Sequence, residues 1–431
     1  KYNIFNAKID KALNGSADWL LIGGPPCQAY SIVGRNRRGD TYLDESKDQR
    51  VGLYKQYLRI LVVHNPAVFV MENVKGLLSA ETKDSPIFSK ILSDLKNPVK
   101  AYLSASRKNG KELKCPGYKI YSLVVNEDFD ESGEPIPRQK DFVICTEKYG
   151  VPQTRHRIIL LGVRRNLDFV PDVLTEVSEI EISKVISDLP KLRGAISKFE
   201  DSDENWRKNL AQLVNKGFIN KVDPAVSNEM LDQLRKLRLL INGTGAEYMN
   251  KNTTPEYRAD WFVDPKFNGV CNHTARGHMM SDLHRYFFIA CYAKAKGVSP
   301  QLSDLPIQLL PDHKKVFKKD GSITHKFPDR FRVQLKGKPA KTITSHISQD
   351  GHYYIHYDPS QCRSFTVREA ARIQTFPDNY FFCGPRTNQF IQVGNAVPPL
   401  LAYQIAQVVM KLFKQFDGER KRKKRLASQT T

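Results

Sequence analysis

The chain has few cysteines, and their arrangement predicts neither a disulfide framework nor a zinc site. Seven cysteines are scattered over 431 residues, and no two of them are spaced as Cys-x-x-Cys. An odd, unpaired set of this kind favours a reducing compartment. Cys271, His273 and His278 lack a second ligand pair at a suitable spacing, so we expect no bound metal.

Long apolar runs are also missing, and the acidic residues are too few to balance the basic ones. No run reaches the roughly 18 residues of a transmembrane helix, and no signal peptide opens the chain, so we expect a cytoplasmic protein without a membrane partner. The 67 Lys and Arg residues exceed the 46 Asp and Glu residues, which leaves a net charge of +21. An excess of this size favours a polyanionic partner, and nucleic acid is the first candidate.

The first part of the chain, residues 1–164, alternates between strand and helix patterns. Helical spacing of apolar residues predicts helices near 54–61 and 86–96. Apolar and β-branched runs predict strands at 19–22, 67–71, 118–126, 141–146 and 157–163. The order of these elements predicts an α/β fold with a parallel-type sheet that ends in a hairpin.

The remainder of the chain has a different character. Residues 165–363 mix short helices, one of them at 227–240, with charged and aromatic loops, and this predicts a separate domain or a large insertion. Helical patterns return within residues 364–417, at 367–374 and 396–414. The basic tail, residues 418–431, is expected to be a solvated, disordered end, and added nonspecific affinity for DNA is a less favoured alternative.

Two residues with catalytic chemistry follow two of the predicted strands. Cys27 lies in the stiff turn Gly23-Gly24-Pro25-Pro26-Cys27-Gln28, and Glu72 ends the next apolar run. Ligands of open α/β sheets bind beyond the carboxyl ends of strands. A thiol and a carboxyl group at two such ends predict a covalent active site, although a lone cysteine in this position is more often a small buried hydrophobe.

Six sequence blocks, including those that contain Cys27 and Glu72, resemble in sequence and order the motifs of the DNA cytosine methyltransferases that methylate carbon 5. Together they are a specific signal, whereas each one alone would be weak. The blocks are Pro25-Pro26-Cys27-Gln28, Asp48-Gln49-Arg50-Val51-Gly52-Leu53, Glu72-Asn73-Val74, Gln153-Thr154-Arg155-His156-Arg157, Arg368-Glu369-Ala370-Ala371-Arg372-Ile373-Gln374-Thr375-Phe376-Pro377 and Gln392-Val393-Gly394-Asn395-Ala396-Val397-Pro398-Pro399.

The resemblance implies a fold and a reaction. The fold is a Rossmann-like methyltransferase sheet over 1–164, completed by the helices of 364–417, with a smaller target-recognition domain over 165–363. In the reaction, the Cys27 thiolate attacks carbon 6 of a flipped-out cytosine, and Glu72 acts as the general acid at ring nitrogen 3. S-adenosylmethionine then supplies the methyl group for carbon 5.

The resemblance also assigns roles to further residues. The remaining residues implied in catalysis are Gln28, Asn73, Arg155 and Arg157. Contacts with S-adenosylmethionine are expected from Asn6, Pro26, Leu53, Asn395 and Ala396. Contacts with double-stranded DNA are expected from Ser31, Arg35, Arg50, Arg276 and Thr344.

The chain departs from the family pattern at its beginning. The family has a strand, a glycine-rich turn and an acidic residue for the cofactor upstream of the Pro-Cys loop, whereas Cys27 is only the twenty-seventh residue here. Gly243-Thr244-Gly245 is not a displaced copy, because it follows a helical pattern and Tyr248 replaces the third small residue. We therefore expect a fragment or one subunit of a split enzyme, with an exposed apolar sheet edge.

Several alternatives remain open at this point. The preferred interpretation is a DNA (cytosine-5-)-methyltransferase of a restriction–modification system, associated with the nucleoid, and the sequence leaves open whether a cognate restriction endonuclease accompanies it. A second is a DNA-recognition subunit that is inactive until another chain supplies the cofactor segment. An RNA cytosine methyltransferase is less favoured, because the expected recognition region spans about 180 residues, far more than the compact region of such relatives.

Overall fold

The described residues form two compact units. The structure is a computed structural model that describes residues 2–25, 51–81, 86–106, 113–237, 243–311 and 328–428. Unit 1 comprises residues 1–146, 156–176 and 403–431, and unit 2 comprises residues 147–155 and 177–402. The domain boundary expected at residue 165 thus corresponds to a chain that passes between the units several times.

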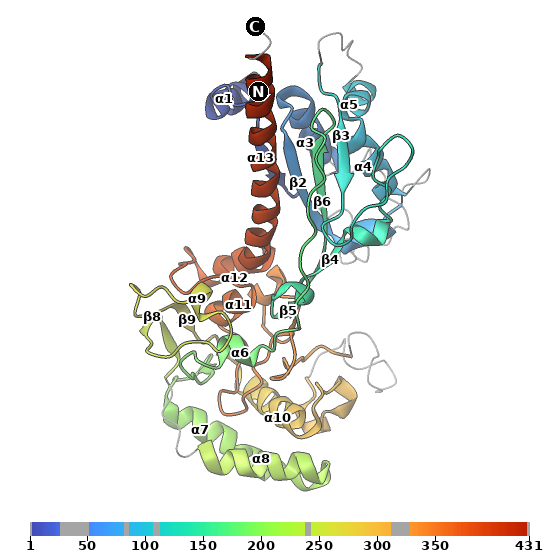
Figure 1. The fold of residues 1–431 in the computed structure, drawn as a ribbon. Helices are drawn as coiled ribbons and strands as arrows, with labels where there is room; N and C mark the ends of the chain where they lie inside the picture. The colour runs from blue at the N-terminus through green and yellow to red at the C-terminus, as the bar shows by residue number, and fades with distance from the viewer. Residues whose placement is uncertain are drawn as a thin grey trace. The chain divides into compact units, whose positions relative to one another are not determined.

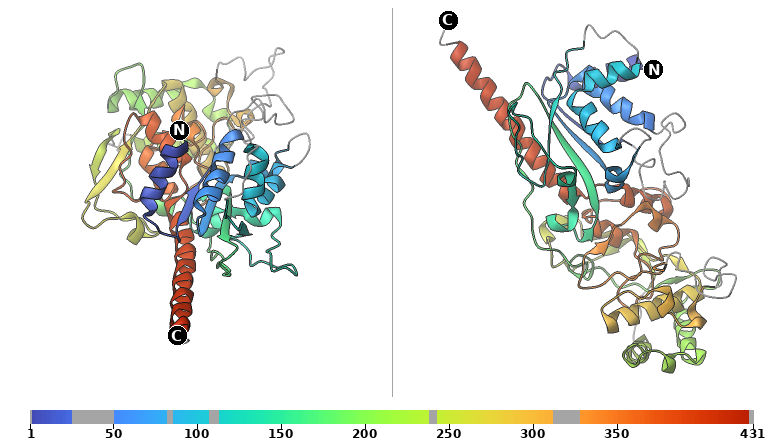
Figure 2. Two further views of the ribbon diagram at one scale, coloured as in Figure 1. Left: turned by 90° about the horizontal axis from the view of Figure 1, so that it is seen from above. Right: turned by 90° about the vertical axis from the view of Figure 1, so that its right-hand side faces the viewer.

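Unit 1 contains a mixed sheet, with helices on both of its faces (Figures 1 and 2). The strands follow the order β1-β2-β6-β3, and β4 also pairs with β6. Their bounds are β1 (Leu20–Gly23), β2 (Val68–Val74), β3 (Tyr118–Tyr121), β4 (Val143–Cys145) and β6 (His156–Arg164). All five predicted strands of the first part of the chain are therefore confirmed.

The pairing of these strands confirms the expected hairpin, which β4 and β6 form, and places β6 between β2 and β3. β1 and β2 are parallel, as predicted. β6, in contrast, runs antiparallel to β2, β3 and β4. A parallel partner requires a long crossover connection, and the chain between β4 and β6 has no crossover helix. The reversed β6 places its first residues at the same edge of the sheet as the carboxyl ends of β1 and β2.

The helices of unit 1 bury the apolar residues of the sheet. Their bounds are α1 (Tyr2–Leu13), α3 (Val51–His64), α4 (Ile87–Lys96) and α5 (Pro98–Ser106), with short turns η1 (Lys75–Ser79) and η2 (Gln139–Phe142). One core joins Leu61 of α3 and Ile91 of α4 to Phe69 of β2 and Leu160 of β6. β1 lies at the edge of the described sheet, and Ile22 is 70 % exposed there, which agrees with the expected apolar edge.

The long helix α13 (Pro399–Ala427) begins in unit 2 and continues through the last part of unit 1. Its Phe416 packs against Phe169, with ring centroids 5.2 Å apart. The helical stretch 386–427 contains one window that is apolar enough, by length and composition alone, to cross a membrane. Leu401, Val409 and Leu412 of this stretch are buried within the protein, and 39% of the window is buried. Residues 418–427, which we expected to be disordered, continue the helix.

Unit 2 contains short strands and helices around two cores. Its helices are α6 (Ser183–Ile186), α7 (Asp203–Ala211), α8 (Pro224–Lys236), α9 (Ala259–Phe262), α10 (Met280–Lys296), α11 (Val367–Ile373) and α12 (Arg386–Asn395). Its strands are β5 (Gln153–Thr154), β7 (Ala195–Ile196), β8 (Gly245–Asn250), β9 (Gly269–Thr274), β10 (Gly277–His278) and β11 (Ala340–Lys341). Its described 3₁₀ turns are η4 (Gln212–Lys216), η5 (Ile219–Lys221), η7 (Leu302–Asp304), η8 (Ile307–Leu309) and η9 (Ser345–Ser348).

One of these cores surrounds α10, and the other surrounds α11 and α12. Both α11 and α12 belong to unit 2, and the chain returns to unit 1 only at Tyr403. The return that we expected at residue 364 therefore comes later, because α11 and α12 bury their apolar side chains against other parts of unit 2.

Candidate active site

Three strand ends of unit 1 meet at one edge of its sheet. Gly23, the last residue of β1, is the register partner of Met71 in β2. At the end of β2, Val74 is the register partner of Arg157, the second residue of β6. Side chains that follow β1 and β2 therefore share this edge with those that begin β6.

Glu72 and Arg157 form an ion pair at this edge. The Arg157 Nε lies 3.0 Å from the Glu72 Oε1, and the two side chains are 17 % and 26 % exposed. Arg157 Nη1 also donates to the main-chain carbonyl of His156 at 2.9 Å. The guanidinium group thus fixes the orientation of the carboxylate, while part of the carboxylate stays open to solvent.

The turn after β1 approaches the same carboxylate. A Cβ atom at Gly24 would lie 3.1 Å from Glu72 Oε2, which is tighter than most contacts of real side chains. Glycine at this position therefore lets the chain pass directly beside the carboxylate. The spacing of the sequence motifs does not predict this close approach.

Asn73 holds the turn from the other side. Its side chain is buried, and its Nδ2 donates to the carbonyl of Pro25 at 3.4 Å. Its Oδ1 accepts a hydrogen bond from the Val74 N–H at 2.9 Å. These contacts hold the turn in place, and the predicted part of Asn73 in catalysis stays a prediction.

Several predicted site residues lie outside the described residues. They are Pro26, Cys27, Gln28, Ser31, Arg35 and Arg50. Their roles in catalysis, cofactor binding and DNA binding stay predictions. The described chain reaches Pro25, and Cys27 is the second residue after it in the sequence.

Arg155 is buried within unit 2 and contacts main-chain carbonyl groups there. Its Nη1 donates to Ile343 at 2.7 Å, and its Nη2 donates to Gly394 at 3.2 Å. Arg155 thereby joins β5 to the carboxyl end of α12. Its predicted part in catalysis stays a prediction, and the described contacts show a bracing function.

Two buried glutamines continue this brace. Gln153 Nε2 donates to Gln374 Oε1 at 2.6 Å, and Gln153 Oε1 accepts from the Ile343 N–H at 2.9 Å. Gln374 Nε2 donates to the Val393 carbonyl at 2.8 Å. The side chains that brace the turn after α12 therefore come from two sequence blocks about 220 residues apart. We had not singled out either glutamine, although both lie in the quoted motifs.

The predicted cofactor residues Asn395 and Ala396 lie in the turn that this brace supports. Asn395 ends α12 and is exposed, and the Ala396 N–H donates to the Val393 carbonyl. A Cβ at Gly394 would lie only 2.2 Å from Ser345 N, so this glycine permits close packing against η9. The turn thus presents a carboxamide on a rigid support.

The other two described cofactor candidates lie in unit 1. Leu53 lies on α3 and is 46 % exposed. Asn6 Oδ1 contacts Arg59 Nη2 and lies 3.1 Å from His64 Nε2. An exposed apolar side chain and carboxamide groups fit the adenine, ribose and amino-acid parts of S-adenosylmethionine, although the Asn6 carbonyl already has partners within unit 1.

The described residues predicted to bind DNA have partners within unit 2. Thr344 Oγ1 lies 2.9 Å from Tyr354 Oη. Arg276 Nη2 donates to Ile347 at 2.8 Å, and its guanidinium carbon lies 4.7 Å from the centroid of Phe390. Burial lowers the pKa of Arg276 from its usual value. Contacts of these two residues with DNA stay predictions.

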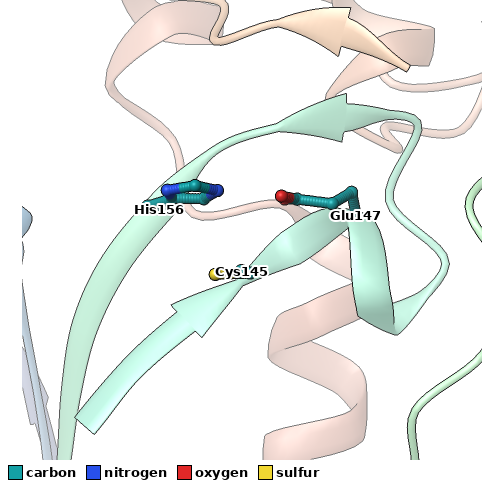
Figure 3. A group of neighbouring side chains, drawn as sticks. All are labelled: Cys145, Glu147 and His156. Atoms are coloured by element: carbon teal, nitrogen blue, oxygen red, sulfur yellow. The ribbon is translucent and has the colours of Figure 1, made fainter. Parts of the chain in front are cut away.

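The histidine-rich segment has contacts that explain it without a metal. His273 Nδ1 lies 2.9 Å from Thr366 Oγ1, and its Nε2 lies 2.8 Å from the Pro190 carbonyl. Burial lowers the pKa of His273 to about 4, so the ring is neutral and both nitrogens have partners. Figure 3 shows a second group, with Glu147 in η3 (Thr146–Tyr149) and with Cys145 and His156 on the paired strands β4 and β6.

Comparison with known proteins identifies the family. The model of the C-5 cytosine-specific DNA methylases matches residues 3–98 and 140–411, which include Glu72, Asn73, Arg155 and Arg157. Type II methyltransferase M.Bpa9945I of Bacillus paralicheniformis is 34% identical over 395 residues, covering 90% of this chain and 69% of that protein.

Two further relatives are less similar in sequence but match a comparable share of this chain. Type II methyltransferase M.DdeI of Desulfomicrobium norvegicum is 26% identical over 412 residues, covering 92% of this chain and 74% of that protein. DNA (cytosine-5-)-methyltransferase M.ApeKI of Aeropyrum pernix is 26% identical over 440 residues, covering 94% of this chain and 83% of that protein. With a match that spans most of its length, the chain belongs to the C-5 cytosine-specific DNA methylase family.

Proposed function

We propose that the chain transfers a methyl group to carbon 5 of a flipped-out cytosine in a specific duplex DNA sequence, as part of a restriction–modification system. The observation that carries this proposal is the Glu72–Arg157 ion pair beside the Gly24-Pro25 turn. The next residues in the chain lead to Cys27. A carboxyl group with a fixed orientation, next to a turn that leads to a thiol, supports acid-assisted covalent catalysis.

In this mechanism, the Cys27 thiolate forms a bond to carbon 6 of the cytosine ring. Electron density moves toward ring nitrogen 3, where Glu72 donates a proton, and carbon 5 becomes nucleophilic. S-adenosylmethionine supplies the methyl group when it is bound. Loss of the carbon 5 proton to solvent then expels the thiolate, and the proton on ring nitrogen 3 returns to Glu72, which restores the neutral aromatic ring.

The described residues support this chemistry by orienting its groups. Arg157 holds Glu72 in place, and Asn73 holds the Pro25 carbonyl of the turn. Arg155 and Gln374 hold the turn that carries Asn395 and Ala396, the proposed contacts with the cofactor. Unit 2 supplies a separate body for recognition of the target sequence, and its contacts with bases are part of the proposal.

The first experiment is a methylation assay with mapping of the product. The chain is incubated with S-adenosylmethionine and unmethylated genomic DNA, and 5-methylcytosine is located by conversion sequencing. Methylation in one short sequence context supports the proposal. Methylation that appears only after addition of a chain with the family's glycine-rich cofactor segment supports the alternative of a complemented subunit, and methylation of RNA alone contradicts the DNA proposal.

The second experiment tests the nucleophile and the acid. Cys27→Ser should abolish transfer and prevent covalent trapping on duplex DNA that contains 5-fluorocytosine, while DNA binding persists. Cys383→Ser is the matched control, because Cys383 is an exposed cysteine of unit 2. Glu72→Gln should slow transfer by roughly 10²–10⁴-fold. An unchanged rate in Glu72→Gln would remove this residue from the mechanism.

A further inference from the structure

The carboxyl end of α13 is a helix without an apolar face. Phe416 is the last buried residue of α13 among the described residues, and every described side chain from Asp417 to Ser428 is exposed or half-exposed. Lys, Arg, Glu, Leu and Ala dominate residues 419–427, and all five are strong helix formers. The segment therefore stays helical although it packs against little of unit 1.

This helical end has a strong positive charge. Residues 420–425 are six basic residues in succession, Arg420-Lys421-Arg422-Lys423-Lys424-Arg425. Arg420 pairs with Asp18 at 2.6 Å, which anchors the helix to unit 1, and Lys423 pairs with Glu419 at 2.8 Å within the helix. Lys421, Arg422 and Arg425 form no ion pair with another residue in the described part of the chain.

The spacing of the basic residues along the helix axis is similar to the spacing of the charges along duplex DNA. Successive residues of an α-helix are rotated by about 100° and rise about 1.5 Å, so six basic residues surround the helix axis over about 9 Å. Duplex DNA carries about one negative charge for each 1.7 Å of its axis, a similar spacing. An anionic membrane surface is a poorer match, because binding in the interface requires an apolar stripe.

We propose that residues 420–425 form a second, sequence-independent contact with DNA, in which Lys421, Arg422 and Arg425 bind backbone phosphates. Guanidinium and ammonium groups bind phosphate oxygens without reading bases. The helix would hold the protein on nonspecific duplex while unit 2 reaches a target. The choice of DNA as the polyanion rests on the proposed function.

The test measures salt-dependent binding to a duplex without cytosine. The full-length protein and the variant K421Q/R422Q/R425Q are titrated with poly(dA)·poly(dT) over a range of KCl concentrations. Glutamine preserves the helix. Each lost phosphate contact should reduce the slope of log K against log[salt] by about 0.9, so the variant should show a slope lower by about 1 to 3.

A control variant separates local contacts from net charge. K8Q/K11Q/K100Q removes the same charge from exposed lysines on α1 and α5 of the same unit. The proposal predicts a slope near that of the unaltered protein for this control. If the two variants have the same slope, whether or not it differs from that of the unaltered protein, the proposal is wrong. Tighter binding to poly(A)·poly(U) than to the DNA duplex would also overturn the proposal. Because the probe contains no cytosine, a failed methylation assay leaves this result interpretable.

Discussion

At the scale of single residues, the site depends on one carboxylate with a fixed orientation. Glu72 is held by Arg157 and lies beside the turn at Gly24. The sequence motifs predicted that Glu72 and Arg157 belong to one site. They could not predict the approach of Gly24 to Glu72, because that distance depends on how β1 and β2 pair. The partners of Arg276 and Thr344 within unit 2 were equally inaccessible, since they lie far away in the sequence.

We expect Gly24→Ala to impair catalysis while leaving the stability of the protein nearly unchanged. The added Cβ would lie 3.1 Å from Glu72 Oε2, and the flexible end of Glu72 would move away from Arg157. Misplacement of a catalytic group by about 1 Å can cost up to 10²-fold in rate, and we expect about 10-fold here. The measurement is kcat on target duplex, together with the thermal midpoint.

Gly337→Ala is the control for this prediction. No atom lies within 4 Å of a Cβ built at Gly337, so this substitution adds the same methyl group without a contact. A Gly24→Ala variant as active as the Gly337→Ala control would show that the turn does not need to pass so close to Glu72.

At the scale of elements, apolar runs predicted the strands of unit 1 and several helices, but not α10. α10 was missed because most of its residues from Leu283 to Ala293 are buried, so it lacks the polar face that marks an amphipathic helix. The predicted hairpin corresponds to β4 and β6, but the position of β6 between β2 and β3 was not predicted, because it depends on how distant strands pair. The hydrogen bonds of Gln153, Arg155 and Gln374 join three elements that are far apart in the sequence, so no single segment predicts them.

We expect Gln374→Ala to destabilise unit 2. The substitution removes the hydrogen bonds of Gln374 to Gln153 Nε2 and to the Val393 carbonyl, and each such bond contributes about 0.5–1.5 kcal/mol. Unfolding monitored through Trp206 and Trp261 of unit 2 should shift to lower temperature. Gln392→Ala is the matched control, since Gln392 is exposed and its side chain bonds to the Cys383 carbonyl. Equal midpoints in the two variants would contradict this function of the brace.

Unit 2 should lose stability as the pH falls below about 6.5. Burial lowers the pKa of both His273 and His356 to about 4. Between pH 4 and 6.5 the unfolded chain therefore binds more protons than the folded one, and stability rises with pH by up to about 1.4 kcal/mol per pH unit for each histidine. Although burial opposes it, pairing with Arg363 lowers the pKa of Glu369, which adds a further loss of stability at more acidic pH.

The histidine contribution can be measured by urea unfolding at several pH values between 5 and 7. His356→Gln should reduce the slope of the unfolding free energy against pH by up to about 1.4 kcal/mol per pH unit, which corresponds to one proton. His346→Gln is the control, because His346 is exposed and lies in the same unit. A slope that is the same in both variants would mean that His356 does not contribute to the acid sensitivity.

At the scale of the whole molecule, charge is the property that the sequence predicted most directly. The net charge of +21 and the match to a DNA methylase family agree on a polyanionic substrate. The division into units was predicted less well, because the chain leaves unit 1 at residue 147, returns at 156 and leaves again at 177. Composition changes gradually along such a path, so it does not mark each crossing.

We expect association with target duplex to be strongly sensitive to salt, while turnover on saturating DNA is not. Electrostatic steering raises association rates and is screened at higher ionic strength. The association rate constant, measured by stopped-flow mixing, should fall at least 10-fold between 50 and 200 mM KCl. The kcat at saturating DNA should change less than about 2-fold over the same range. A salt-independent association rate would contradict a long-range contribution of the net charge.

The short excursion of residues 147–155 into unit 2 limits how unit 2 can be exchanged between related proteins. Transplanting residues 177–402 from a relative would leave Gln153 and Arg155 behind, and these side chains bond to Ile343 and Gly394 of the transplanted piece. A chimaera that preserves these contacts within one donor sequence would therefore have to include residues 147–155. Two crossover points meet this condition only if they enclose residues 147–402, so that residues 156–176 of unit 1 are exchanged as well.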